Sequence, residues 1–148
     1  MLGDKVWKTR MKKMKIVAAA ILKRNGKLFI AKRPEGKSLA HHWEFPGGKQ
    51  EEGETLQETL HRELREELNI ETEVGEFFMQ STYDYDFGQI QINCFWVKLC
   101  DENCTIYSNE HEETSWVLPS ELKNYRFAPA DVPVVEALSK VNDLTVLS

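Results

Sequence analysis

The sequence has no apolar run of about eighteen residues, the length that a membrane-spanning helix requires. It also shows no pattern of a secretory signal, in which basic residues precede a short apolar segment. Both absences exclude the membrane and secreted classes. We therefore expect a cytoplasmic protein with no membrane partner.

The sequence also has fewer basic than acidic residues, with 19 Lys and Arg against 24 Asp and Glu and a net charge of −5. Proteins that bind long nucleic acids need a basic surface, so we expect no such partner. Cysteine is scarce and odd in number. Cys94, Cys100 and Cys104 lack the paired spacing of a zinc site, which predicts reduced thiols, with Cys94 in the core of a strand.

The chain also lacks internal repeats, linkers and low-complexity segments. Its 148 residues suffice for one hydrophobic core but not comfortably for two. Residues 1–14 are polar and basic and contain Met11 and Met14 as alternative starts, so we treat them as an N-terminal extension. The remainder, 15–148, is predicted to be one domain.

What the chain does contain is an alternation of strand and helix patterns. Ile16–Leu22 is an almost continuous apolar run typical of a central strand, and Asn25-Gly26 predicts a tight hairpin. Further extended segments and a last helix follow, namely Leu28–Ala31, Trp43–Phe45, Thr72–Glu76, Phe77–Tyr85, Gln89–Leu99, Ser115–Leu118, a helical turn at Pro119–Leu122 and a helix at Val132–Val141. This order predicts an α/β fold with a mixed β-sheet between helices.

The most informative segment is Gly47–Ile70. Thr55 and Glu58 have the spacing of a capping box, so a helix is predicted to begin near Thr55. Asn69 is suited to the left-handed conformation that ends a helix. Leucines at every fourth position predict one buried side, namely Leu56, Leu60, Leu64 and Leu68.

On this helix Glu63, Glu66 and Glu67 share one face because they are three and four residues apart. Three neighbouring carboxylates repel one another, and a divalent cation offsets that repulsion; Mg²⁺ prefers such oxygen ligands. The alternative is a solvated face stabilised by ion pairs with Arg62 and Arg65.

The whole segment resembles the Nudix box. The resemblance rests on Gly48, on Glu54, on Arg62-Glu63-Leu64 and on Glu66 to Ile70, at the spacing of that motif. Asn69 departs from the family pattern, which usually has Gly there. Because Asn tolerates the left-handed conformation, we expect little functional loss.

The resemblance implies an α/β/α sandwich over roughly Lys15 to Val141 and a hydrolase that splits a nucleoside triphosphate into monophosphate and pyrophosphate. It implies Mg²⁺, with Mn²⁺ as a substitute, held by Glu63, Glu66, Glu67 and the Gly48 carbonyl. The metal would neutralise phosphate charge and activate a water.

Other residues of the motif have expected catalytic roles. Glu54 is expected to orient the metal or its water; the alternative is an acidic residue favoured near a helix N-terminus. Arg62 is expected to orient Glu63 by a charge-assisted pair rather than to touch substrate.

Outside the motif, relatives often carry an acid six residues before a tryptophan, which here is Glu110 before Trp116. Glu110 is therefore a candidate catalytic acid, and an ordinary acidic loop is its alternative. His111 is a candidate base or a solvated loop histidine. Arg33 and Lys49 are candidate phosphate contacts or plain surface charges.

The segment 125–133 resembles that of bacterial MutT-like and CTP pyrophosphohydrolase proteins, where the acid or amide at Asp131 faces the base. An ionised Asp131 only accepts hydrogen bonds, which suits the exocyclic amine of cytosine or adenine. Its alternative is a cap of the last helix. Phe45 and Phe127 are candidates to stack on the base.

We therefore predict a (d)CTP or 5-modified cytosine nucleotide as substrate. The alternatives are an 8-oxo-dGTP hydrolase of the MutT type, a hydrolase of another diphosphate such as ADP-ribose, and a nucleotide-binding module without activity. The protein is expected to be a monomer or homodimer.

Overall fold

A computed structural model describes residues 14–141, so most of the predicted N-terminal extension (1–13) lies outside the described residues. The elements in chain order are β1 (Lys15–Arg24), β2 (Lys27–Lys32), β3 (Trp43–Glu44), β4 (Gly47–Lys49), α2 (Leu56–Leu68), β5 (Thr72–Tyr85), β6 (Gly88–Leu99), β7 (Glu113–Val117), the 3-10 helices η1 (Pro119–Asn124) and η2 (Pro129–Asp131), and α3 (Val132–Leu138).

The strands of the described residues form one seven-stranded sheet with the order β3-β2-β1-β6-β5, while β4 pairs with β1 and β7 pairs with β2. β1 and β6 run parallel and the other pairs are antiparallel, so the sheet is mixed as predicted. The hairpin between β1 and β2 turns at Asn25 and Gly26, both with positive φ, as their sequence predicts.

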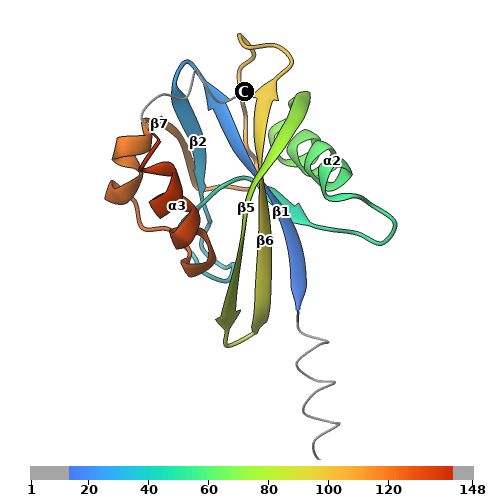
Figure 1. Cartoon of the computed structure of the whole chain (residues 1–148), viewed down its shortest axis with the longest axis vertical. Coiled ribbons are helices and arrows are strands. Elements are labelled where there is room, and N and C mark those ends of the chain that lie inside the picture. Colours follow the sequence, from blue (N-terminus) through green and yellow to red (C-terminus); the bar gives the residue numbers. More distant parts are fainter. Residues whose placement is uncertain (1–13, 142–148) are drawn as a thin grey trace, which may run out of the picture.

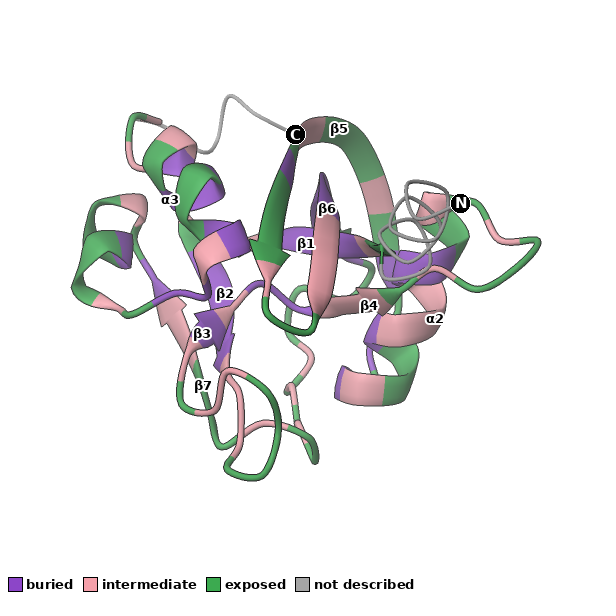
Figure 2. Cartoon of the chain, turned by 90° about the horizontal axis from the view of Figure 1, so that it is seen from below, coloured by how far each residue is buried: buried purple, intermediate pink, exposed green. Residues whose placement is uncertain are grey.

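Helices cover both faces of this sheet, with α2 on one side and α3 with the 3-10 helices on the other (Figure 1). Alternate residues of the central strands point to opposite faces, which produces two cores. Ala18, Ala20 and Leu22 of β1 pack with the buried leucines of α2, whereas Ala19 and Ile21 pack toward α3. Figure 2 shows the buried residues concentrated on the strands between the helices. The predicted sandwich is confirmed.

α2 begins and ends where the sequence predicts. Thr55 and Glu58 form both hydrogen bonds of the capping box, and Asn69 adopts the left-handed conformation (φ 54°) at the C-terminal end. Leu60, Leu64 and Leu68 are fully buried, and each contributes roughly 1.5–3 kcal/mol of hydrophobic stabilisation.

Two predictions about elements were wrong in detail. The segments Thr72–Glu76 and Phe77–Tyr85 form one strand, because register shifts between Val74 and Met79 absorb the irregularity within the pairing with β6. The last helix ends at Leu138 rather than Val141. Cys94 lies in the core as predicted, and no helix of the described residues is long and apolar enough to cross a membrane.

Candidate active site

The glycine turn brings the backbone against α2. Gly47 and Gly48 pair with Ala19 and Ala18 of β1. A Cβ atom on Gly47 would overlap the Ala18 carbonyl, and one on Gly48 would overlap the carboxyl group of Glu63. The absence of side chains at both positions therefore allows the turn to lie between the sheet and the carboxylates of α2.

Glu63 and Glu67 form a carboxyl pair on this side of α2. They are hydrogen-bonded to each other, and burial together with the charge of Glu63 raises the pKa of Glu67 to about 9. The Oε2 atom of Glu67 is shielded from solvent and has no hydrogen-bond partner among the described residues. A shielded carboxyl oxygen without a partner, next to a second carboxyl group, fits a hard divalent cation.

Glu66 is placed differently. Its side chain is 60% exposed, and its Oε2 lies 3.4 Å from Nη1 of Arg62. No group of three or more His, Cys, Asp or Glu side chains in residues 14–141 is arranged to hold a metal ion. The structure thus brings two of the three predicted carboxylates together, and metal binding by Glu66 stays a prediction.

Arg62 connects this pair to the loop before α2. Its Nε and Nη2 atoms donate to the two carboxylate oxygens of Glu54 (2.6 and 2.9 Å), and its Nη1 donates to Glu63 (2.7 Å). The expected contact between Arg62 and Glu63 is present. The bidentate contact with Arg62 holds the pKa of Glu54 down at about 2. Glu54 also accepts a hydrogen bond from Thr59 and is not among the residues that line the pocket described next. Its role toward a metal is untested.

A pocket of about 300 Å³ adjoins the carboxyl pair. Eight residues predicted from the sequence and both sides of the sheet contribute to its wall, as do several residues that were not predicted. The predicted ones are Arg33, Phe45, Gly48, Lys49, Glu67, Glu110, His111 and Asp131. Its size suits a nucleotide-sized ligand.

Glu44 is the main polar residue of the pocket that the sequence analysis missed. It accepts from Arg33 (Nη1–Oε1 2.9 Å) and lies 3.2 Å from Nε2 of the buried His111. Its charge raises the pKa of both Glu67 and Asp131. No local spacing reveals Glu44, because its partners are 11 and 67 residues away.

Phe45 lines the pocket, but Phe127 does not. The Phe127 ring stacks on Phe45 (centroids 5.2 Å apart) and is 7% exposed. A backbone bridge to Trp43 fixes it there. The structure therefore does not place Phe127 where a base could stack on it, contrary to expectation.

Asp131 is buried (7% exposed), and its side chain makes no capping hydrogen bond to α3. It is instead hydrogen-bonded to the backbone of Phe45. Burial, then the charge of Glu44, raises its pKa well above the usual range. Because this favours the neutral carboxyl, Asp131 can donate as well as accept, unlike the ionised group assumed from sequence.

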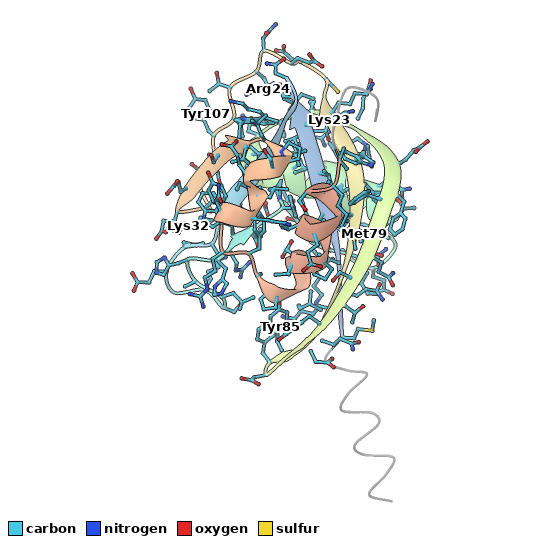
Figure 3. The ribbon with its side chains drawn as sticks, turned by 60° about the vertical axis from the view of Figure 1, so that its left-hand side comes forward. Lys23, Arg24, Lys32, Met79, Tyr85 and Tyr107 are labelled. Atoms are coloured by element: carbon cyan, nitrogen blue, oxygen red, sulfur yellow. The ribbon has the colours of Figure 1, made fainter. Side chains whose placement is uncertain are left out.

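Two aromatic residues of the pocket, Tyr85 and Phe87, were not predicted either. They lie at the end of β5 and in the turn before β6, where Figure 3 labels Tyr85. The signal in the sequence was only a run of alternating aromatics in a strand, which is also the pattern of ordinary sheet packing.

Comparison with known proteins decides the family, since residues 12–138 match the NUDIX domain model. The chain belongs to the Nudix family. It is 41% identical over 125 residues to the CTP pyrophosphohydrolase of Escherichia coli K12, covering 84% of this chain and 91% of that protein. It is 31% identical to the 8-oxo-dGTP diphosphatase of the same organism, covering 88% of this chain and 100% of that one.

Solved structures agree with the fold. The solution structure of the E. coli ORF135 protein has a TM-score of 0.73 and 39% identity, covering 86% of this chain and 89% of that chain. MutT from methicillin-resistant Staphylococcus aureus 252 has a TM-score of 0.69 and 35% identity, covering 85% of this chain and 95% of that chain. The Nudix protein described here is an enzyme that acts on phosphorus anhydrides, and Nudix hydrolases generally use divalent metal ions.

Proposed function

We propose that this Nudix enzyme is an Mg²⁺-dependent nucleoside triphosphate pyrophosphohydrolase that releases a nucleoside monophosphate and pyrophosphate. The observation that carries the proposal is the Glu63–Glu67 pair: Oε2 of Glu67 is shielded without a partner, the Glu63 carboxyl lies against Gly48, and Gly48 and Glu67 line a pocket of nucleotide size.

Glu63 and Glu67, with Glu66 and the Gly48 carbonyl, would hold the cation. When bound, it would neutralise phosphate charge and lower the pKa of the attacking water. The protein's own contribution is positional. Arg62 fixes the Glu63 carboxylate by its 2.7 Å hydrogen bond and thereby sets where the pair presents its oxygens.

Cationic side chains of the pocket would contact the phosphates, and an acidic one would act on the attacking water. Lys49 lines the pocket and could contact a phosphate. Arg33 already donates to Glu44 and to the Ser38 carbonyl, so it would contact a phosphate while still paired with Glu44. Glu110 lines the pocket and raises the pKa of Glu67, which supports a role as a further acid.

We propose a cytosine nucleotide as the preferred substrate. A neutral Asp131 accepts from the exocyclic amine of cytosine through one oxygen and donates to the adjacent ring nitrogen through the other. The likeness to a CTP pyrophosphohydrolase over most of both chains supports this choice.

The second candidate is 8-oxo-dGTP, because a neutral Asp131 can also donate to a carbonyl oxygen of an oxidised guanine. The similarity to 8-oxo-dGTP diphosphatases favours it as well.

The test is pyrophosphate release with Mg²⁺ across CTP, dCTP, 5-methyl-dCTP, ATP, dGTP and 8-oxo-dGTP, with ADP-ribose assayed for monophosphate products. We expect the highest kcat/KM on a cytosine nucleotide. Preference for 8-oxo-dGTP would overturn the substrate and keep the reaction, and activity on ADP-ribose alone would overturn the triphosphate reaction.

A further inference from the structure

Three aromatic side chains lie in contact along the end of β5 and its turn. The rings of Tyr83 and Tyr85 have centroids 4.7 Å apart, and those of Tyr85 and Phe87 are stacked at 4.9 Å with an interplanar angle of 6°. Tyr85 and Phe87 line the pocket, whereas Tyr83 does not. The end of the β5–β6 hairpin thus supplies an aromatic wall, made of Tyr85 and Phe87.

The hydroxyl of Tyr85 also reaches a distant part of the chain. The backbone N–H of Ala130 donates to Tyr85 Oη at 2.9 Å, across 45 residues of sequence. Ala130 is 3% exposed, so loss of this acceptor would leave a buried N–H without its partner. The contact therefore ties η2 to the aromatic wall, one residue before Asp131.

The electrostatics agree with this placement. Burial raises the pKa of the Tyr85 phenol above its usual value, and an ionised Asp131 would raise it further. Asp131 is therefore within electrostatic reach of the phenol. The neutral hydroxyl that results accepts from Ala130 and keeps its own O–H free to donate.

We propose that Tyr85 is a specificity-determining positioning residue, whose ring with Phe87 forms the wall for the nucleotide base and whose hydroxyl fixes Asp131 through Ala130. This proposal rests on the nucleoside triphosphate reaction proposed above. It follows that the hydrogen bond between Ala130 and Tyr85 contributes to the spacing between the aromatic wall and the Asp131 carboxyl.

Tyr85→Phe tests the hydroxyl, since it keeps the ring. Tyr83→Phe is the matched control, because it removes a phenol hydroxyl from the neighbouring ring outside the pocket. We expect Tyr85→Phe to raise KM for CTP about five- to tenfold with kcat little changed, the scale of one lost hydrogen bond. The ratio of kcat/KM for CTP to that for 8-oxo-dGTP should shift by a similar factor, and Tyr83→Phe should shift neither.

Melting temperatures separate positioning from plain destabilisation, which would lower kcat/KM for both nucleotides equally. An equal loss for both substrates, or a Tyr85→Phe variant indistinguishable from Tyr83→Phe, would overturn the proposal. Phe87→Leu provides a second test at a residue that is 44% exposed and therefore outside the core. It should raise KM for every nucleotide, and an unchanged KM would refute the aromatic wall.

Failure of this proposal and of the proposed function are distinguishable in the same assay. If the unmodified enzyme hydrolyses none of the triphosphates, the proposed function is wrong and the role of Tyr85 is wrong with it. If it is active and Tyr85→Phe changes nothing, only the role of Tyr85 is refuted.

Discussion

Glu67 is costly to ionise in the environment that α2 gives it. Its carboxyl is partly buried and hydrogen-bonded to Glu63, and Glu44 and Glu110 add further negative charge. Each of these factors favours the neutral form, and a divalent cation would reverse that preference. At the scale of single residues, the same arrangement that opposes ionisation favours cation binding.

Glu67→Gln should therefore reduce kcat by orders of magnitude while leaving the fold intact. The amide keeps the shape of the side chain and removes the charge that the cation needs. Steady-state kinetics with Mg²⁺ give the activity, and a thermal melt in the absence of metal gives the stability, which should not fall. Full activity in this variant would refute the metal assignment.

Asp131→Asn should keep the preference for cytosine nucleotides, because its amide offers the base edge the same acceptor and donor as a neutral carboxyl, whereas Asp131→Leu, which offers neither, should lose that preference. The measurement is kcat/KM for CTP and 8-oxo-dGTP in both variants and in the unmodified enzyme. An unchanged ranking in Asp131→Leu would show that Asp131 does not read the base.

Asp131→Asn also has a predictable effect on stability. The pKa of Asp131 is raised in the folded state above an unfolded value of about 4, so the folded state binds the proton more tightly. The contribution of Asp131 to stability is therefore full at low pH and falls as pH rises above about 4 toward the raised pKa. Asp131→Asn should gain stability relative to the unmodified protein as pH rises from about 4 toward the raised pKa. Parallel melting curves over that range would contradict the raised pKa.

At the scale of elements, α2 is positioned by contacts at its ends and middle. The capping box fixes its start, Asn69 fixes its end, and Arg62 joins its central turn to Glu54 and to the Lys49 carbonyl. These contacts set how the carboxyl pair faces the Gly47-Gly48 turn. Burial of the leucine side alone would leave that orientation less well defined.

Arg62→Lys should lower both activity and the melting temperature, because a single ammonium cannot replace two parallel hydrogen bonds to Glu54 and one to Glu63. We expect a decrease of roughly 3–6 °C for a domain of this size. Arg65→Lys is the matched control. Arg65 also makes a bidentate contact, to Glu71, but its side chain is 60% exposed. Equal effects of the two substitutions would exclude a special role for Arg62.

Asn69→Ala should destabilise the protein by about 1 kcal/mol, because alanine tolerates the left-handed conformation less well than asparagine. Asn69→Gly, the usual residue of the family, should be at least as stable as the unmodified protein and fully active. Chemical denaturation measures both. A stable Asn69→Ala variant would show that the helix end can relax without strain.

At the scale of the whole molecule, the pocket takes residues from both faces of the sheet. Glu67 belongs to α2, whereas Asp131 lies beside α3 on the opposite side. Both line the same pocket, as do Gly47 and Gly48, which have no room for a side chain between the sheet and the Glu63 carboxyl. A larger residue at Gly48 would displace the Glu63 carboxyl, so this turn is a condition for the site.

The sequence predicted the parts of this arrangement that depend on local spacing. The start and end of α2, the carboxyl pair and the contact between Arg62 and Glu63 all follow from residues within a few positions of one another. The mixed sheet and its helices were also predicted, in part from the resemblance to the Nudix family.

The contacts that sequence reasoning missed join residues far apart in the chain. Tyr85 meets Ala130 across 45 residues, and Glu44 meets His111 across 67. The displacement of Phe127 from the pocket depends on its bridge to Trp43. The raised pKa of Asp131 depends on burial, which a helix-cap pattern does not reveal.

The most direct test of the central claim is pyrophosphate release from CTP by the unmodified enzyme and by Glu67→Gln, each with and without Mg²⁺. We predict release only from the unmodified enzyme with Mg²⁺, accompanied by stoichiometric CMP. Release without metal, or equal release by the Glu67→Gln variant, would contradict the assignment of Glu63 and Glu67 as the metal-binding pair.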